Sequence, residues 1–142
     1  MALKTYPFEP DLAVNPKTKR MDFMYRPYIQ IRLQYKKAIT SNFIRALVDS
    51  GSDYNIFPSS FAKEIGIDYR KGIPHKASSG IGGISIYTYG AIASINTGIK
   101  TFDTVIFFAD EVRVPILGRH GFFNFFKNIE FNTKGKKMLI KY

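Results

Sequence analysis

The stretch Ala46-Leu47-Val48-Asp49-Ser50-Gly51-Ser52 predicts more about this chain than any other part of it. Three apolar residues run directly into an acidic residue and a Ser-Gly-Ser turn. Because strand interiors are depleted in Asp, a carboxylate has little structural reason to follow Leu47 and Val48. We interpret the stretch as a strand whose end presents Asp49 in a tight loop, where a carboxylate takes part in chemistry. The chain has one loop of this kind.

The size and composition are those of one globular domain. The 142 residues are enough to bury a core, and 45% of them are hydrophobic. The absence of cysteine excludes a disulfide framework and a thiolate metal site. No apolar run approaches the roughly 20 residues that span a bilayer, and the first 20 residues lack the apolar core of a signal peptide. We therefore expect a cytoplasmic protein with no membrane partner.

The net charge of +10 raises the question of a nucleic-acid partner. Lysine and arginine come in small dispersed groups at expected turns and solvated edges, and they form no helical stripe. We interpret them as a solvated surface and do not expect nucleic acid to bind. A nucleic-acid-associated protein is the alternative, and retention of nucleic acid at raised salt would favour it.

The chain is predicted to consist of an N-terminal arm and one β domain. Residues 1–27 contain four prolines, and we expect an extended arm laid over the body or left loose. From residue 28 polar and apolar residues alternate with a period of two, which predicts a half-buried strand over 28–35. Further short strands are predicted over 43–48, 55–57, 84–89, 91–95, 102–108, 129–131 and 138–140. The predicted class is all-β, with a closed barrel-like body over 28–142.

One or two short helices are expected among these strands. A serine at the cap position and a stopping glycine predict about two turns over 58–66. A second short helix, rich in phenylalanine, is expected over 121–126.

Two further motifs follow the Asp49 loop in order. The glycine-rich segment Gly80-Ile81-Gly82-Gly83-Ile84 lies between two extended runs, which indicates a hairpin with a tip that can bend. The second motif, Ile116-Leu117-Gly118-Arg119, is an apolar run that ends at a glycine and precedes the second predicted helix.

The three motifs in this order resemble those of the retroviral-type aspartic proteases (retropepsins) and their cellular and microbial relatives. The resemblance covers residues 28–142. It implies an all-β fold equivalent to one lobe of an aspartic protease, with the glycine-rich hairpin as a flap over the substrate. It also implies an endopeptidase that hydrolyses peptide bonds through an activated water. Two carboxylates share one proton in this chemistry and supply base and acid together, and no cofactor is implied.

Since the chain has a single suitable loop, the resemblance implies a homodimer. Each copy would contribute its own Asp49 at a two-fold axis, where an isologous interface repeats the same residue. One copy alone would be inactive. The expected partners are a second copy of the chain and a peptide or protein substrate.

The resemblance carries over other site residues where the motifs match. Ser50 stands where a hydroxyl bonds across the dimer axis, Gly51 leaves room for the substrate backbone, and Ser52 can donate to the Asp49 carboxylate. Asp53 is expected to contact the substrate backbone and to form a buried ion pair with Arg119, bidentate where well formed. The other substrate-binding residues expected are Ile56, Gly80, Ile81, Gly82, Gly83, Ile84 and Ile116.

The residues leave other interpretations open. Asp49 can be the acid of an Asx-turn, the glycine-rich segment can be a merely flexible hairpin, and the same fold can serve as a non-catalytic dimeric module that binds peptides. A metal site is disfavoured because His75 and His120 are the only histidines and no cysteine is present. A serine nucleophile at Ser50 or Ser52 lacks the spacing of a nucleophile elbow.

Overall fold

The computed structural model of the protein describes residues 2–79 and 82–142. The chain forms two compact units, one made of Met1–Tyr28 with Phe126–Tyr142 and one made of Ile29–Phe125. The C-terminal residues thus group with the N-terminal arm. No helix among the described residues is long and apolar enough to cross a membrane.

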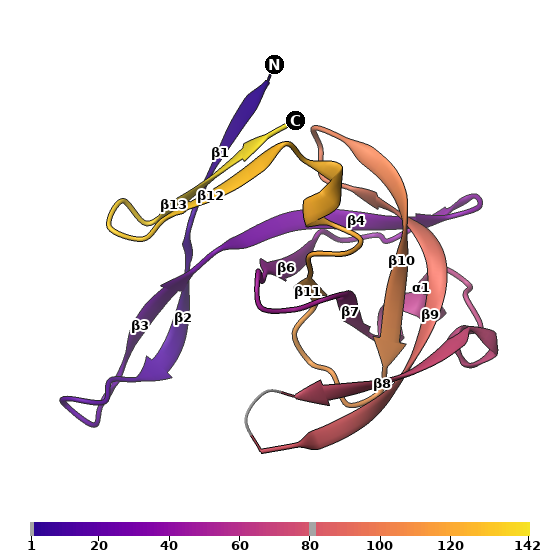
Figure 1. The fold of residues 1–142 in the computed structure, drawn as a ribbon, viewed down its shortest axis with the longest axis horizontal. Coiled ribbons are helices and arrows are strands. Elements are labelled where there is room, and N and C mark those ends of the chain that lie inside the picture. Colours follow the sequence, from indigo (N-terminus) through magenta and orange to yellow (C-terminus); the bar gives the residue numbers. More distant parts are fainter. Residues whose placement is uncertain (1, 80–81) are drawn as a thin grey trace. The chain divides into compact units, whose positions relative to one another are not determined.

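The larger unit is built on an eight-stranded sheet in the order β5-β4-β6-β11-β7-β10-β9-β8. β4 also pairs with β9, where Arg32 lies opposite Asn96, so the sheet curls back on itself (Figure 1). The all-β class and the barrel-like body are therefore confirmed. The strands are β4 (Tyr28–Tyr35), β5 (Ala38–Ile39), β6 (Ile44–Val48), β7 (Asn55–Pro58), β8 (Ile73–Ser79), β9 (Ile84–Asn96), β10 (Thr101–Ala109) and β11 (Ile116–Leu117).

The core of this unit follows from the alternation in the sequence. In β4 the side chains of Ile29, Ile31 and Leu33 are buried, while Gln30 between them is exposed. The last residues of β10 are buried on both faces of the sheet, which explains the continuous apolar run there. Burial of such side chains stabilises the fold by about 25 cal/mol per Å² of apolar surface.

The short strand β11 brings two distant motifs together. It pairs in parallel with β6, with Ile116 opposite Leu47, and antiparallel with β7, with Ile116 opposite Ile56. The loop after β6, which begins at Asp49, and the segment that begins at Gly118 therefore leave the same end of the sheet. This pairing positions the candidate site.

Two details of the larger unit differ from the sequence prediction. The strands expected over 84–89 and 91–95 are one continuous strand, β9. Gly90 lies in its interior, and a Cβ there would come 2.8 Å from the ring of Phe107, so this glycine accommodates a packed ring. A 3-10 helix, η1 (Tyr69–Lys71), was not predicted.

The short helices are close to their predicted places. α1 (Ser59–Glu64) lies within the range predicted from 58 to 66, but no side chain caps its N-terminus. The hydroxyl of Ser59 instead donates to Asp110 at 2.5 Å. The phenylalanine-rich segment forms a single 3-10 turn, η2 (Phe123–Phe125).

The smaller unit shows that the N-terminal arm is paired and not loose. β1 (Leu3–Pro7) pairs antiparallel with β13 (Lys137–Lys141), which also pairs with β12 (Asn128–Asn132), the hairpin predicted near the C-terminus (Figure 1). β2 (Glu9–Val14) and β3 (Met21–Arg26) form a separate two-stranded hairpin. The prolines do not prevent strand formation here, because they stand at strand ends and edges, where a backbone N–H is not needed for pairing.

Candidate active site

The backbone around Asp49 holds its carboxylate in a defined orientation. The N–H of Asp49 donates to the carbonyl of Leu117 in β11 at 2.9 Å, which fixes the end of β6. The N–H of Gly51 donates to Asp49 Oδ1 at 2.9 Å, and the N–H of Ser52 donates to the Asp49 carbonyl at 3.2 Å. The side chain of Asp49 is half-buried. The loop thus presents one carboxylate with a charge-stabilising backbone donor.

The Ser52 hydroxyl does not donate to the Asp49 carboxylate, although this was expected from the motif. Its hydroxyl donates to the carbonyl of Tyr54 at 2.8 Å, so its single proton is not directed at Asp49. The expectation was wrong because the turn brings the carbonyl two residues further on within reach. Ser52 therefore stiffens the loop, and the backbone of Gly51 takes the role of donor to the carboxylate. Ser50 is exposed, and its bond across a dimer axis stays a prediction.

The Asp49 loop is braced by the segment after β11. The N–H of Arg119 donates to the Ser52 carbonyl at 2.9 Å, and the N–H of His120 donates to the Asp53 carbonyl at 2.7 Å. Gly118 packs against the backbone of Tyr54, and a Cβ there would lie 2.4 Å from the Tyr54 carbonyl oxygen. Glycine is therefore required at 118 by this close approach.

The expected ion pair between Asp53 and Arg119 is present, but it is neither buried nor bidentate. Arg119 Nη2 contacts Asp53 Oδ1, and their side chains are 56% and 60% exposed. The pair lies at the rim of the loop, because the backbone bonds of the same two segments already occupy the interior. Solvent screening leaves such an exposed pair with a small effect on stability.

A cavity of about 350 Å³ opens beside Asp49. Asp49, Gly51 and Ser52 form its polar wall, and Ile56 and Ile116 stand among its apolar side chains, as expected. The structure adds Ala77, Ser78, Ile86 and Val112 to its lining. The arrangement suits an apolar side chain held next to a carboxylate.

A second cavity of about 380 Å³ extends away from Asp49, and it shares with the first cavity Gly51, Ser52, Ile56, Ala77 and Ser78. Its outer part is polar and is lined by Asp53, Tyr54, His75 and Lys76. Asp53 is paired with Arg119. Lys76 is exposed and carries no hydrogen bond or ion pair with a described residue, so its positive charge is not neutralised there.

The flap prediction falls partly outside the described residues. β8 and β9 form the predicted hairpin, with Ser79 opposite Ile84, but Gly80 and Ile81 lie outside the part that the structure describes. Gly82 and Gly83 both have positive φ, +116° and +68°, which explains the glycines there. Ile84 is 69% exposed and lines neither cavity, whereas Ile86, further along β9, does.

Both histidines contact Tyr54. The ring centroid of Tyr54 lies 5.2 Å from that of His75 and 6.0 Å from that of His120. The two imidazoles thus pack on an aromatic side chain and make no hydrogen bond to a loop serine. Among residues 2–79 and 82–142 no three His, Asp or Glu side chains converge as metal ligands would.

Comparison with protein families shows to which family the chain belongs. A family model described as aspartyl protease matches residues 38–120, which is more than half of the chain. This chain belongs to the aspartyl protease family. The matched range contains the Asp49 loop, the glycine-rich hairpin and the Gly118-Arg119 segment, so the resemblance drawn from the motifs is confirmed. Its activity class is aspartic-type endopeptidase.

Two solved structures are similar to this aspartyl protease. A retropepsin-like aspartic protease from Rickettsia conorii is 14% identical and matches 100% of this chain and 96% of its own, with a TM-score of 0.61. The EIAV protease complexed with the inhibitor HBY-793 is 22% identical, covers 66% of this chain and 82% of its own, and has a TM-score of 0.48. No curated protein sequence matches the chain. The Rickettsia structure supports the retropepsin-like fold.

Several site residues of the aspartyl protease carried no sequence signal. Asn55 is fully buried and bonds to the Gly118–Gly121 segment, yet the sequence shows only an asparagine at the start of a strand. Val112 reaches the cavity from a loop without periodicity. Ala77 and Lys76 could have been found by extending the flap hairpin backwards from the glycines, because β8 pairs with β9 along its whole length.

Proposed function

We propose that the chain is a homodimeric endopeptidase whose catalytic dyad is formed by Asp49 from each of two copies. The observation that carries this proposal is the position of Asp49 at the polar edge of an apolar cavity, in a loop held by backbone hydrogen bonds. A second carboxylate is needed for the chemistry, and the chain has one Asp-Ser-Gly loop to supply it. Two-fold symmetry places a residue near the axis opposite its own copy.

The proposed mechanism uses no covalent intermediate. Two carboxylates about 3 Å apart cannot both ionise comfortably, so they share one proton and titrate as a pair. The ionised member takes a proton from water as the water oxygen bonds to the peptide carbonyl carbon, and the protonated member donates its proton to the carbonyl oxygen. The tetrahedral diol then collapses: the C–N bond breaks, the proton taken from water passes to the leaving nitrogen, and a diol hydroxyl returns its proton to the pair. The Gly51 N–H donates to Asp49 Oδ1 and holds the carboxylate in place.

The cavity geometry supports extended substrates with an apolar side chain next to the cleaved bond. Ile56, Ile86 and Ile116 offer an apolar wall within reach of the Asp49 loop. The β8–β9 hairpin lies alongside, and closure of such a hairpin excludes water and holds the peptide.

The test compares D49N with D68N, which makes the same change of charge at an exposed site outside both cavities. Both are assayed against a peptide library between about pH 4 and 7, because the activity of a carboxylate pair depends on its holding one proton. D49N is expected to lose cleavage and keep its fold and association, while D68N cleaves like the wild type. Near-normal cleavage by D49N would overturn the assignment of Asp49.

A mixing experiment tests the shared dyad directly. When an equal amount of D49N is added to a fixed amount of wild-type chain and copies exchange, activity should fall to about half, because mixed dimers are inactive. Unchanged activity would show that one chain is sufficient. A wild-type chain that binds a peptide tightly but never cleaves it would favour the alternative, a non-catalytic peptide-binding module.

A further inference from the structure

The hairpin of β2 and β3, here called the arm ribbon, separates its side chains into two chemically different faces. The pairing register places Leu12 opposite Phe23 and Val14 opposite Met21. Because side chains alternate along a strand, these pairs share one face with Pro10 and Tyr25. The opposite face carries Glu9, Asp11, Ala13, Asp22, Met24 and Arg26. The first face, called the apolar face, bears no charged residue.

The apolar face is exposed to solvent. The exposed fractions are 66% for Leu12, 58% for Val14, 62% for Met21, 61% for Phe23 and 43% for Tyr25. Large side chains of this kind offer about 200 Å² each, so together they expose on the order of 500 Å². A contiguous apolar patch of a few hundred Å² is typical of an interaction site.

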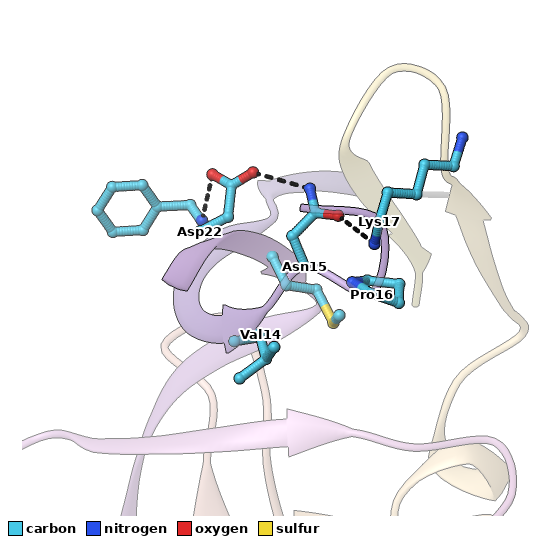
Figure 2. Close-up of a pocket in the computed structure, with 8 residues that line it drawn as sticks. Val14, Asn15, Pro16, Lys17 and Asp22 are labelled. Atoms are coloured by element: carbon cyan, nitrogen blue, oxygen red, sulfur yellow. Dashed lines mark hydrogen bonds between the residues drawn. The ribbon is translucent and has the colours of Figure 1, made fainter. Parts of the chain in front are cut away.

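The ribbon is ordered by contacts that leave Leu12, Val14, Met21 and Phe23 exposed, while Tyr25 at the base of the same face packs against Lys136, whose Nζ lies 4.2 Å from the ring centroid. Figure 2 shows its tip, where the Asn15 side chain accepts a bond from the Lys17 N–H at 2.9 Å and donates to Asp22 at 3.3 Å. At its base Asp11 bonds to the hydroxyl of Tyr28 and lies 3.8 Å from Arg26. All of these bonds are made by the turn or by the charged face. The side chains of Leu12, Val14, Met21 and Phe23 are thus available for contact with another surface.

We propose that the apolar face of the arm ribbon packs against a second copy of this chain and forms part of the dimer interface. The inference rests on the proposed function in one respect, the need for a second copy to complete the Asp49 pair. A two-stranded hairpin is marginally stable by itself in water, so a packing partner explains its persistence. Two arms, one from each copy, bring on the order of 1,000 Å² of apolar surface, the size at which specific interfaces begin.

The distribution of charge favours a second copy of the chain over an acidic protein or a nucleic acid as the partner of the apolar face. Each copy carries a net charge of +10, so contact between copies requires a surface that places no cations against each other. The apolar face meets this requirement. An acidic protein or nucleic acid would instead be held by cations, and the part of the face formed by Leu12, Val14, Met21 and Phe23 carries none. A lipid surface is a separate possibility because Lys17, Lys19 and Arg20 stand at the tip, and the experiment includes it as an outcome.

Met21 and Met24 provide a matched pair for the test. Both lie in β3 and both are exposed, at 62% and 44%, but they belong to opposite faces. We expect M21S and F23S to raise the dissociation constant of the dimer about tenfold or more in sedimentation equilibrium, and M24S to leave it unchanged. The same dissociation constant for M21S, F23S and M24S would overturn the proposal.

Because the chain contains no cysteine, a single introduced thiol can be labelled selectively. The rate of labelling gives a second test of the interface, which does not require the serine variants to be stably folded. In M21C and M24C the single thiol is labelled with a maleimide at chain concentrations below and above the dissociation constant of the dimer. Labelling of M21C should slow about tenfold on association, while M24C should react at one rate throughout. Equal protection of both thiols, or of neither, would overturn the proposal.

The outcomes separate this inference from the proposed function. If the wild-type chain dimerises and cleaves, D49N does not cleave, and M21S dimerises normally, only the role of the ribbon is wrong. If the wild-type chain cleaves as a monomer, both proposals fail. If M21S loses binding to phosphatidylglycerol vesicles and keeps its dimer affinity, the occupant is a lipid surface and this proposal is overturned.

Discussion

Asn55 joins the strand after the Asp49 loop to the segment that braces that loop. Its Oδ1 accepts a hydrogen bond from the N–H of Gly118 at 3.0 Å, and its Nδ2 donates to the carbonyl of Gly121 at 2.9 Å. Nδ2 also lies 3.3 Å from the carbonyl of Val105 in β10. One buried amide therefore satisfies backbone groups from two segments more than 45 residues away. The geometry of the candidate site depends on this side chain.

Asn55→Ala should destabilise the protein and disturb the loop. The substitution leaves the buried N–H of Gly118 without its partner, while the Gly121 carbonyl keeps the bond from the Thr104 hydroxyl at 2.8 Å. One unsatisfied buried donor costs about 1–3 kcal/mol in the free energy of unfolding. Denaturant unfolding measures this loss. Asn42→Ala, at an exposed position, is the control and should change stability very little. Equal stability of the two variants would show that water replaces the amide.

Arg119→Met should have only a small effect on stability. Both side chains of the Asp53–Arg119 pair are more than half exposed, so the free energy of unfolding should fall by less than about 1 kcal/mol. A double-mutant cycle with Asp53→Asn measures the coupling between the two charges. A coupling of several kcal/mol would contradict the exposed geometry and would mean that association of copies buries the pair.

Asp110 should make the protein sensitive to acid. Hydrogen bonds lower the pKa of its carboxyl from 3.8 to about 2, the largest cause being the Ser59 hydroxyl, followed by the Tyr69 hydroxyl, with Arg70 also contributing. Because the pKa is lower in the folded chain, Asp110 stabilises the fold above pH 3.8. This contribution is lost as the pH falls towards about 2.

Unfolding of Asp110→Asn at a series of pH values tests this effect. The variant should be less stable than the wild type at neutral pH, and the difference should shrink between pH 3.8 and about 2. Asp68→Asn, which removes an exposed carboxylate paired with Lys71, should follow the wild-type curve. A difference that stays constant through this window would show that the hydrogen bonds do not depend on ionisation.

Lys76→Glu should change which peptides are cleaved. Lys76 lines the outer part of the second cavity, where its charge is not neutralised by a described residue. A substrate carboxylate that reaches this cavity should be favoured by the wild type, by up to about fivefold for a solvent-exposed pair. Cleavage rates of matched peptides that carry Glu or Gln measure the preference, which should reverse in Lys76→Glu. Lys37→Glu, at an exposed turn, should keep it.

Local patterns in the sequence were enough to predict most of the larger unit. The alternation over 28–35 predicted β4, and the apolar run into Asp49 predicted β6 and its loop. The glycines after residue 79 marked the β8–β9 hairpin, and a Gly-Arg motif marked the segment that braces the loop. Each of these signals is contained within about ten residues, since strand period and turn preference are properties of neighbours in the chain.

The partners of individual side chains could not be predicted in this way. The donor to the Asp49 carboxylate is the Gly51 backbone and not the Ser52 hydroxyl, because the turn geometry decides which donor is nearest. The Asp53–Arg119 pair was expected to be buried and is exposed. The arm was expected to be extended and either laid over the body or loose, but β1 pairs with β13 at the other end of the chain.

The sequence by itself predicted a β protein with one carboxylate loop, and from that single loop we inferred that a second copy completes the acid pair. Only the tertiary structure decided that Asn55 braces the loop, that Lys76 and Val112 reach the cavities, and that the arm ribbon has an uncovered apolar face. The physical reason is that strand period and turn chemistry act over a few residues, whereas contacts between residues 50 or more positions apart exist only after the sheet has closed.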